Sequence, residues 1–251
     1  MMAKDVVLTI TETAERLSQQ IADHILQAAR SAVAQRGIFH LVLAGGSTPR
    51  PTYRLLATQP RRALFPWAST HFYWGDERCV PPSAEGSNYG DAWQLFLQEA
   101  ATPDEQIHRM RGELAAEETA LDYAAQLADM APEGRRWPRF DLVLLGLGRD
   151  GHTASLFPEQ VRELELSRPV VPVRADYDER PAERVSLTPR VFNDAHAIVF
   201  LVTGEKKAQA VAATLAEEGA GVELPASLIR PDDGELYWYL DKPAASRLDV
   251  A

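Results

Sequence analysis

The sequence predicts an α/β fold in which one mostly parallel sheet carries helices on both faces. Segments 39–44 and 140–145 are short and almost entirely apolar, which is typical of strands buried on both sides. Helical patterns alternate with such strands along the chain. A chain of 251 residues can bury one large core. We expect a single domain over residues 1–251, because no linker, repeat or low-complexity tract divides the chain.

The first half of the chain alternates expected helices and strands. A helix should begin at Thr11 or Thr13, because apolar residues recur at helical spacing from Leu17 onward, and Gly37 suits a left-handed helix end. The other elements expected here are strand 39–44, a helix through 53–56, strand 71–74, and helices 88–100 and 117–130.

The second half supplies further strands and one more helix. We expect segment 163–183 to hold an irregular flap, although part of it also reads as a strand. Ligands of open parallel sheets bind beyond the carboxyl ends of the strands, and four strand ends here carry unusual polar loops, which favours one shared site. The expected elements are strands 140–145, 170–173, 185–187 and 197–202, helix 206–217 and strand 235–240.

Composition excludes several classes of function. The formal net charge of -10 and the pI near 5.1 disfavour nucleic acid as a partner, because phosphodiester backbones are repelled. Cys79 is the one cysteine, so an intramolecular disulfide and a zinc site built on several thiolates are excluded. No segment reads as a signal peptide or a membrane span, and we expect a cytoplasmic protein. The oligomeric state stays open, with a monomer among the alternatives.

The first polar loop follows strand 39–44. Gly45 and Gly46 allow the backbone to approach an anion closely, and Ser47 and Thr48 add hydroxyl donors before Pro49. A tight turn in which Ser47 or Thr48 caps the next helix explains the same residues equally well. The pattern is not a P-loop, because no Gly-Lys-Ser/Thr sequence follows.

The loop after strand 140–145 matches the dinucleotide fingerprint Gly-x-Gly-x-x-Gly at Gly146, Gly148 and Gly151. Dinucleotide binding is nevertheless disfavoured. Pro158 leaves little room for the helix that must follow the third glycine, and Asp150 would repel a pyrophosphate. We therefore expect no dinucleotide cofactor.

Two charged groups at strand ends are candidates for chemistry. His152 directly follows the loop just described, and a neutral imidazole can take a proton from water near neutral pH. Asp76, Glu77 and Arg78 follow strand 71–74, where Arg78 could bind an anion or a carbonyl and Asp76 could orient a hydroxyl or the imidazole. A structural histidine and a solvated turn with an internal ion pair are the simpler alternatives.

Further cations could hold an anionic substrate. Lys206 and Lys207 open an expected helix, where their charges oppose the helix dipole unless an anion is bound. Arg184, at the start of a strand, is a further candidate for the same anion. Arg190 is another cation in this part of the chain, and the sequence does not explain it. The six histidines are scattered, so no metal site is expected.

Taken together, these loops resemble the glucosamine-6-phosphate isomerase/6-phosphogluconolactonase family. The likeness covers nearly the whole chain in the family's order, and the ordered set is far more specific than any one motif. The matching stretches are LVLAGGSTPRPTYRLL (41–56), FYWGDERCVPPSAEGSNYG (72–90), FDLVLLGLGRDGHTASLFP (140–158) and RVSLTPRVFNDAHAIVFLVTGEKKAQAV (184–211), with LPASLIRP and LYWYLD near the end.

The resemblance implies a Rossmann-like fold of the NagB/ribose-phosphate isomerase/CoA transferase-like kind, without a dinucleotide. It implies His152 as the general base that activates water, with Asp76 and Arg78 as the acid and the arginine of an Asp-Glu-Arg motif. It leaves open whether Lys206 or Lys207 reaches the phosphate. The residues expected to bind substrate are Gly45, Gly46, Ser47, Thr48, Gly148, Asp150, Gly151, Arg184 and Lys207.

The activity implied is hydrolysis of 6-phospho-glucono-1,5-lactone to 6-phosphogluconate in the oxidative pentose phosphate pathway. A lactone is an activated ester, so neither a covalent nucleophile nor a metal is required. Arg78 and the backbone amides around Gly148 are the candidates for stabilising the oxyanion. Two alternatives stay open: an isomerase or deaminase of an amino-sugar phosphate, and a catalytically silent sugar-phosphate sensor. Arg78 and the Thr-Ala-Ser-Leu-Phe-Pro run after His152 favour the lactonase.

Overall fold

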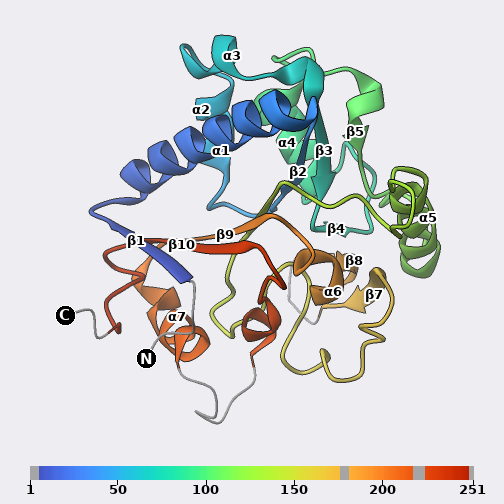
Figure 1. Cartoon of the computed structure of the whole chain (residues 1–251). Coiled ribbons are helices and arrows are strands. Elements are labelled where there is room, and N and C mark those ends of the chain that lie inside the picture. Colours follow the sequence, from blue (N-terminus) through green and yellow to red (C-terminus); the bar gives the residue numbers. More distant parts are fainter. Residues whose placement is uncertain (1–5, 176–180, 217–223, 249–251) are drawn as a thin grey trace.

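Seven parallel strands form the main sheet of the computed structural model, which describes residues 6–175, 181–216 and 224–248 (Figure 1). Each neighbouring pair runs parallel. The α/β class and the mostly parallel sheet are thereby confirmed. In spatial order the strands are β1 (Val6–Thr11), β10 (Glu235–Asp241), β9 (Ala197–Val202), β6 (Leu142–Leu145), β2 (Phe39–Leu43), β3 (Thr70–Trp74) and β5 (Ile107–His108).

A second, smaller sheet is antiparallel and holds β4 (Asp76–Arg78), β8 (Glu183–Leu187) and β7 (Val170–Arg174) in that order. The strands expected at 170–173 and 185–187 are confirmed, and they belong to this second sheet, which the sequence did not predict. Gly75 joins the two sheets, because its N–H donates to Leu43 at 3.0 Å and its carbonyl accepts from Leu187 at 2.8 Å. The chain leaves the main sheet at this residue and starts β4.

The first helix, α1 (Ala14–Arg36), has the ends that the sequence predicted. The Thr13 hydroxyl accepts from the Arg16 N–H, and Gly37 adopts the left-handed conformation while donating to Val33. The other helices are α2 (Arg50–Leu56), α3 (Arg61–Leu64), α4 (Asn88–Ala92), α5 (Ala116–Asp129), α6 (Pro189–Phe192) and α7 (Ala208–Leu215).

Two expected helices differ in extent. The helix expected over 88–100 is α only through α4 and continues as a π-helical turn, Trp93–Leu97. The helix expected over 206–217 begins as a 3₁₀ turn, Glu205–Lys207, and its last residue lies outside the described residues. Of the flap expected over 163–183, residues 170–174 form β7 and residues 176–180 lie outside the described residues. None of the described helices is long and apolar enough to cross a membrane.

The sheet divides the apolar core into two halves, each covered by helices (Figure 1). Alternate residues of β6 show the division, since Leu142 and Leu144 pack with α1, α2 and α4. Val143 and Leu145 face the opposite side, with α5, α7 and the small sheet. All four side chains are buried, and each burial contributes about 1.5–3 kcal/mol. This rigid base carries the loops at the strand ends.

Three histidines and a tyrosine cluster near the amino ends of β2, β3 and β5. His71 Nδ1 and His108 Nε2 are 2.8 Å apart, and His40 Nδ1 lies 3.0 Å from the Tyr73 hydroxyl. Burial lowers the pKa of His40 and the pKa of His108 to about 4, although the charge of Asp141 opposes the shift at His40. These imidazoles are therefore neutral in the folded protein at neutral pH.

Stability should fall as the pH drops from about 6.5 to about 4. Unfolded histidines, with a pKa near 6.5, bind protons in this window that folded His40 and His108 do not, so acid favours unfolding. Urea unfolding at pH 7.5 and pH 5 measures the loss. In His40→Gln the difference between the two pH values should shrink. An equal pH dependence in wild type and variant would contradict this origin.

Candidate active site

Four neighbouring strands of the main sheet carry the polar loops picked out in the sequence. In the order β9, β6, β2, β3 these strands lie side by side and run parallel, so their carboxyl ends share one edge. Residues 204–207 follow β9, and the loop 146–158, here the histidine loop, follows β6. The loop 45–49, here the glycine loop, follows β2, and 76–78 follow β3. The expected convergence of these loops on one edge is confirmed.

The glycine loop is anchored at its start. The buried Tyr53 hydroxyl donates to the carbonyl of Ala44 at 2.8 Å and accepts from its N–H at 3.0 Å. Burial raises the pKa of Tyr53, which keeps the phenol neutral. Gly46 and Ser47 are exposed and Thr48 is half-buried. No side chain caps α2, so the interpretation of Ser47 or Thr48 as a helix cap was wrong.

Gly45 must be glycine because of a contact from another segment. A Cβ placed on Gly45 would lie closer than 3.0 Å to the amide atoms of Asn88, nearer than Cβ atoms come to other groups. Asn88 is the first residue of α4 and is 3% exposed. The Asn88 amide thus packs directly beneath the glycine loop.

Asp76 is buried at 7% exposure, and both of its carboxylate oxygens accept hydrogen bonds. The Ser155 hydroxyl donates to Oδ2 at 2.6 Å. The Asn88 amide donates to Oδ1 at 3.2 Å and to the Asp76 carbonyl at 2.8 Å. The alternative of a solvated turn over 76–78 was therefore wrong. Asn88 and Ser155 were not singled out from the sequence, although both lie in stretches that match the family.

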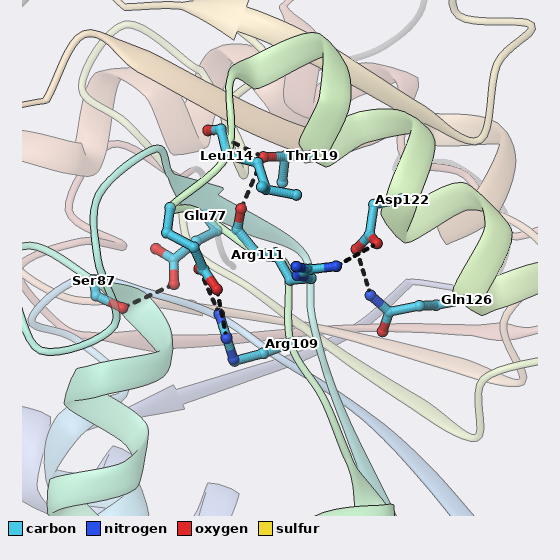
Figure 2. Close-up of polar contacts among 9 residues, drawn as sticks. Glu77, Ser87, Arg109, Arg111, Leu114, Thr119, Asp122 and Gln126 are labelled. Carbon is cyan, nitrogen blue, oxygen red and sulfur yellow. Dashed lines mark hydrogen bonds and ion pairs between the residues drawn. The ribbon is translucent and has the colours of Figure 1, made fainter.

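Glu77 ties β4 to the beginning of α4. This buried carboxylate accepts from the N–H groups of Arg78, Asn88 and Tyr89 at 2.7–2.8 Å. It also accepts from the Ser87 hydroxyl at 3.1 Å, the contact drawn in Figure 2. Burial raises the pKa of Glu77, while the backbone hydrogen bonds oppose the shift. Its role is to hold backbone in place.

Two arginines face each other across the small sheet. Arg78 on β4 pairs with Arg184 on β8 in the antiparallel register. Arg78 donates to the Gly86 carbonyl, and its Nε has no partner among the described residues. Arg184 is buried, donates to Pro181 at 3.2 Å, and lies 5.8 Å from the centre of the Phe157 ring. Two arginines at paired positions of one ladder bring positive charge to this place, which favours an anion.

His152 is held by Asp150 across a turn at Gly148. The distance from His152 Nδ1 to Asp150 Oδ1 is 2.6 Å, and the Gly148 N–H donates to the His152 carbonyl at 2.7 Å. A Cβ on Gly148 would lie closer than 3.0 Å to both side chains, so the pair needs glycine there. Because a carboxylate accepts from Nδ1, the neutral ring carries its proton on Nδ1, and Nε2 is the basic nitrogen.

Asp150 stays ionised throughout the physiological range. Partial burial by itself raises the pKa of Asp150, but the hydrogen bonds and the charge of His152 outweigh it and lower the pKa to about 2. Phe157 also packs against the imidazole, with ring centres 4.9 Å apart. His152 therefore contacts both an ionised carboxylate and an aromatic ring that lies near Arg184.

The helix that a dinucleotide fingerprint requires does not form after Gly151. Residues 152–158 make turns, with an isolated bridge between Thr153 and Leu156. Gly151 has a positive φ, and its carbonyl accepts from Ala226 at 3.1 Å. The structure thus agrees with the rejection of this motif.

The lysines after β9 differ in exposure. Gly204 donates to both carboxylate oxygens of Asp241, at 2.9 and 3.1 Å, which fixes the turn to the end of β10. Lys206 is exposed and Lys207 is half-buried at the start of α7, which favours Lys207 for an inward role.

Arg190 is explained by its guanidinium, which lies 5.8 Å from the centre of the Trp137 ring. Within residues 6–175, 181–216 and 224–248, no three His, Cys, Asp or Glu side chains gather to hold a metal ion.

Fold and site define an α/β protein in which a histidine–aspartate pair, two arginines and a glycine loop share one sheet edge. The family model "Glucosamine-6-phosphate isomerases/6-phosphogluconolactonase" matches residues 12–238. A 6-phosphogluconolactonase of Haemophilus influenzae is 37% identical over 209 residues, covering 83% of this chain and 87% of the relative. The chain belongs to this family.

Solved structures agree with that assignment. The 6-phosphogluconolactonase of Trypanosoma brucei superposes with a TM-score of 0.87 at 30% identity, covering 99% of this chain and all of the other. A monomeric glucosamine-6-phosphate deaminase superposes with a TM-score of 0.80 at 20% identity, covering 97% of this chain and all of the other. The second likeness establishes the fold alone.

His152→Ala should raise the pKa of Asp150 from about 2 toward or above its ordinary value of 3.8. The hydrogen bonds that lower the pKa are lost, while partial burial, which raises it, remains in part. Carboxyl ¹³C NMR titration measures the change. Glu113, whose pKa the Arg109 hydrogen bond lowers to about 2, serves as the internal control and should not move. An Asp150 pKa that stays near 2 in the variant would contradict the pairing.

Proposed function

We propose that this protein hydrolyses 6-phospho-glucono-1,5-lactone to 6-phosphogluconate, with His152 as the general base. The observation that carries the proposal is the short contact between His152 Nδ1 and Asp150, which leaves Nε2 as the basic nitrogen that can take a proton from water. Family membership and the 37% identity to a 6-phosphogluconolactonase support the choice of substrate.

Cationic groups from three strand ends suit a substrate that carries a phosphate and a lactone carbonyl. Arg184 and Lys207 are the candidates for binding the phosphate, together with the glycine loop residues Gly45, Gly46, Ser47 and Thr48. Arg78 and the backbone around Gly148 are the candidates for the oxyanion. Binding the phosphate at a fixed place positions the lactone carbonyl near the imidazole, which lowers the entropic part of the barrier.

The reaction needs one proton transfer in each direction. Water attacks C1 of the lactone while its proton passes to Nε2 of His152, and the carbonyl electrons form an oxyanion. When the oxyanion collapses, the bond between C1 and the ring oxygen breaks. The imidazolium then gives its proton to the leaving ring oxygen. Asp150 stabilises the imidazolium during this interval, because its own pKa near 2 keeps it ionised.

The deaminase alternative is favoured by one observation, the fold shared with a glucosamine-6-phosphate deaminase. Release of ammonia from glucosamine 6-phosphate would decide for it. Phosphosugar binding without turnover would decide for the silent sensor. We further propose a cytoplasmic location, a single domain over residues 1–251 and a reaction without a cofactor, and the oligomeric state stays open, with a monomer among the alternatives.

The protein should accelerate lactone opening well above the spontaneous rate, and His152→Ala should lower kcat about 10²–10⁴-fold, the usual contribution of a general base. The lactone is generated in place from glucose 6-phosphate by a dehydrogenase, and 6-phosphogluconate formation is followed. Gln106→Ala, a buried polar residue that donates to Ala68 near the amino ends of the strands, is the control and should keep its kcat. Full turnover by folded His152→Ala would disprove the assigned base.

A further inference from the structure

Asp76 is a buried carboxylate with no cationic partner among the described residues. No ion pair of the described residues includes Asp76, and its oxygens are held by a neutral hydroxyl and a neutral amide. Burying a charge in this way is unfavourable unless hydrogen bonds compensate it. A hydrophobic residue of similar size would fill the same space with a smaller desolvation penalty. We therefore look for a role of the Asp76 carboxylate other than stabilising the fold.

The two donors belong to different loops of the site. Ser155 lies in the histidine loop, three residues after His152, and Asn88 lies beneath Gly45 of the glycine loop. Asp76 stands between them at the beginning of β4. The chain of contacts Gly45, Asn88, Asp76, Ser155 thus connects the loop after β2 to the loop after β6.

Both donors are also fixed through their backbones. The Asn88 N–H donates to Glu77 at 2.7 Å. The Ser155 N–H donates at 3.4 Å to the Ser186 hydroxyl, and Ser186 faces Asp76 in the β4–β8 ladder. Asn88, Ser155 and Ser186 are each 3% exposed or less. Because this network is buried and its two donors are held by their backbones, it is rigid. A shift of one loop is therefore passed on to the other loop.

We propose that Ser155 and Asn88 are positioning residues for the lactone hydrolysis, acting through Asp76 to set the separation of the histidine loop from the glycine loop. The inference rests on the proposed function. A phosphosugar lactone has a fixed length from phosphate to carbonyl, so the loop that binds one end and the histidine that attacks the other must keep a matching distance. A misplacement of about 1 Å can lower the rate by about 10²-fold.

Ser155→Ala removes one hydroxyl and leaves His152, Asp150 and Gly148 in place. We expect kcat to fall about tenfold or more, by the loss of alignment, while the midpoint of the pH profile of kcat stays where it is, because the His152–Asp150 pair is intact. Ser18→Ala is the matched control, since Ser18 is equally buried and donates to Ala14 at 2.9 Å within α1. It should leave kcat unchanged.

Asn88→Ala removes the other side-chain donor to Asp76. It is a second, independent test if Ser155→Ala does not fold. Its kcat should fall similarly. In the Asp76→Asn background, adding Ser155→Ala should have little further effect on kcat, because residues that act through one group are not additive.

The results distinguish the positioning role of Ser155 and Asn88 from the proposed lactone hydrolysis. Wild-type kcat in both folded variants, Ser155→Ala and Asn88→Ala, would overturn the positioning role and leave the proposed function intact. Independent, additive losses in the Asp76→Asn background would also overturn it. No acceleration of lactone opening by the wild-type protein would overturn the proposed function, and the inference with it.

Discussion

Within the seven-stranded sheet, β9, β6, β2 and β3 are direct neighbours and all run in the same direction. This parallel pairing determines where the chemistry can be, because every loop that leaves these strands begins at one edge. The strands themselves are buried on both faces and carry alternating apolar side chains into two core halves. The core is thus a rigid base, and the loops that carry the candidate site residues leave it at its carboxyl edge.

At that edge lie charged side chains that do not contribute to the apolar core. Asp76 is a buried carboxylate with neutral partners, and Arg78 faces Arg184 across a strand ladder. Each arrangement costs stability unless it is compensated by hydrogen bonds or by a bound anion. His152 is the simplest case, since Asp150 compensates it directly and selects its tautomer. At this edge, the charged side chains are therefore better explained by the precise placement of groups than by a gain in folding stability.

Several features could be predicted from the sequence because each depends on a local pattern. Apolar strands, the Thr13 and Gly37 ends of α1, and the polar loops at strand ends are of this kind. The small antiparallel sheet and the π-helical turn after α4 could not, because packing between distant segments decides them. The same holds for the hydrogen bonds of Asn88 and Ser155, because the carboxylate that accepts them is 12 and 79 residues away in the chain. Strand β1 was also not predicted, since its half-exposed residues lack a clear alternation.

The central claim, that the His152–Asp150 geometry carries the activity, is tested most directly by two glycines of one loop. A methyl group on Gly148 would collide with both side chains, whereas one on Gly146 meets no atom within 4 Å. Steady-state lactone hydrolysis by Gly148→Ala and Gly146→Ala, both checked for folding by thermal unfolding, makes the comparison. We predict a loss of kcat of about 10²-fold in Gly148→Ala and near wild-type kcat in Gly146→Ala. Equal activities of the two folded variants would contradict the account.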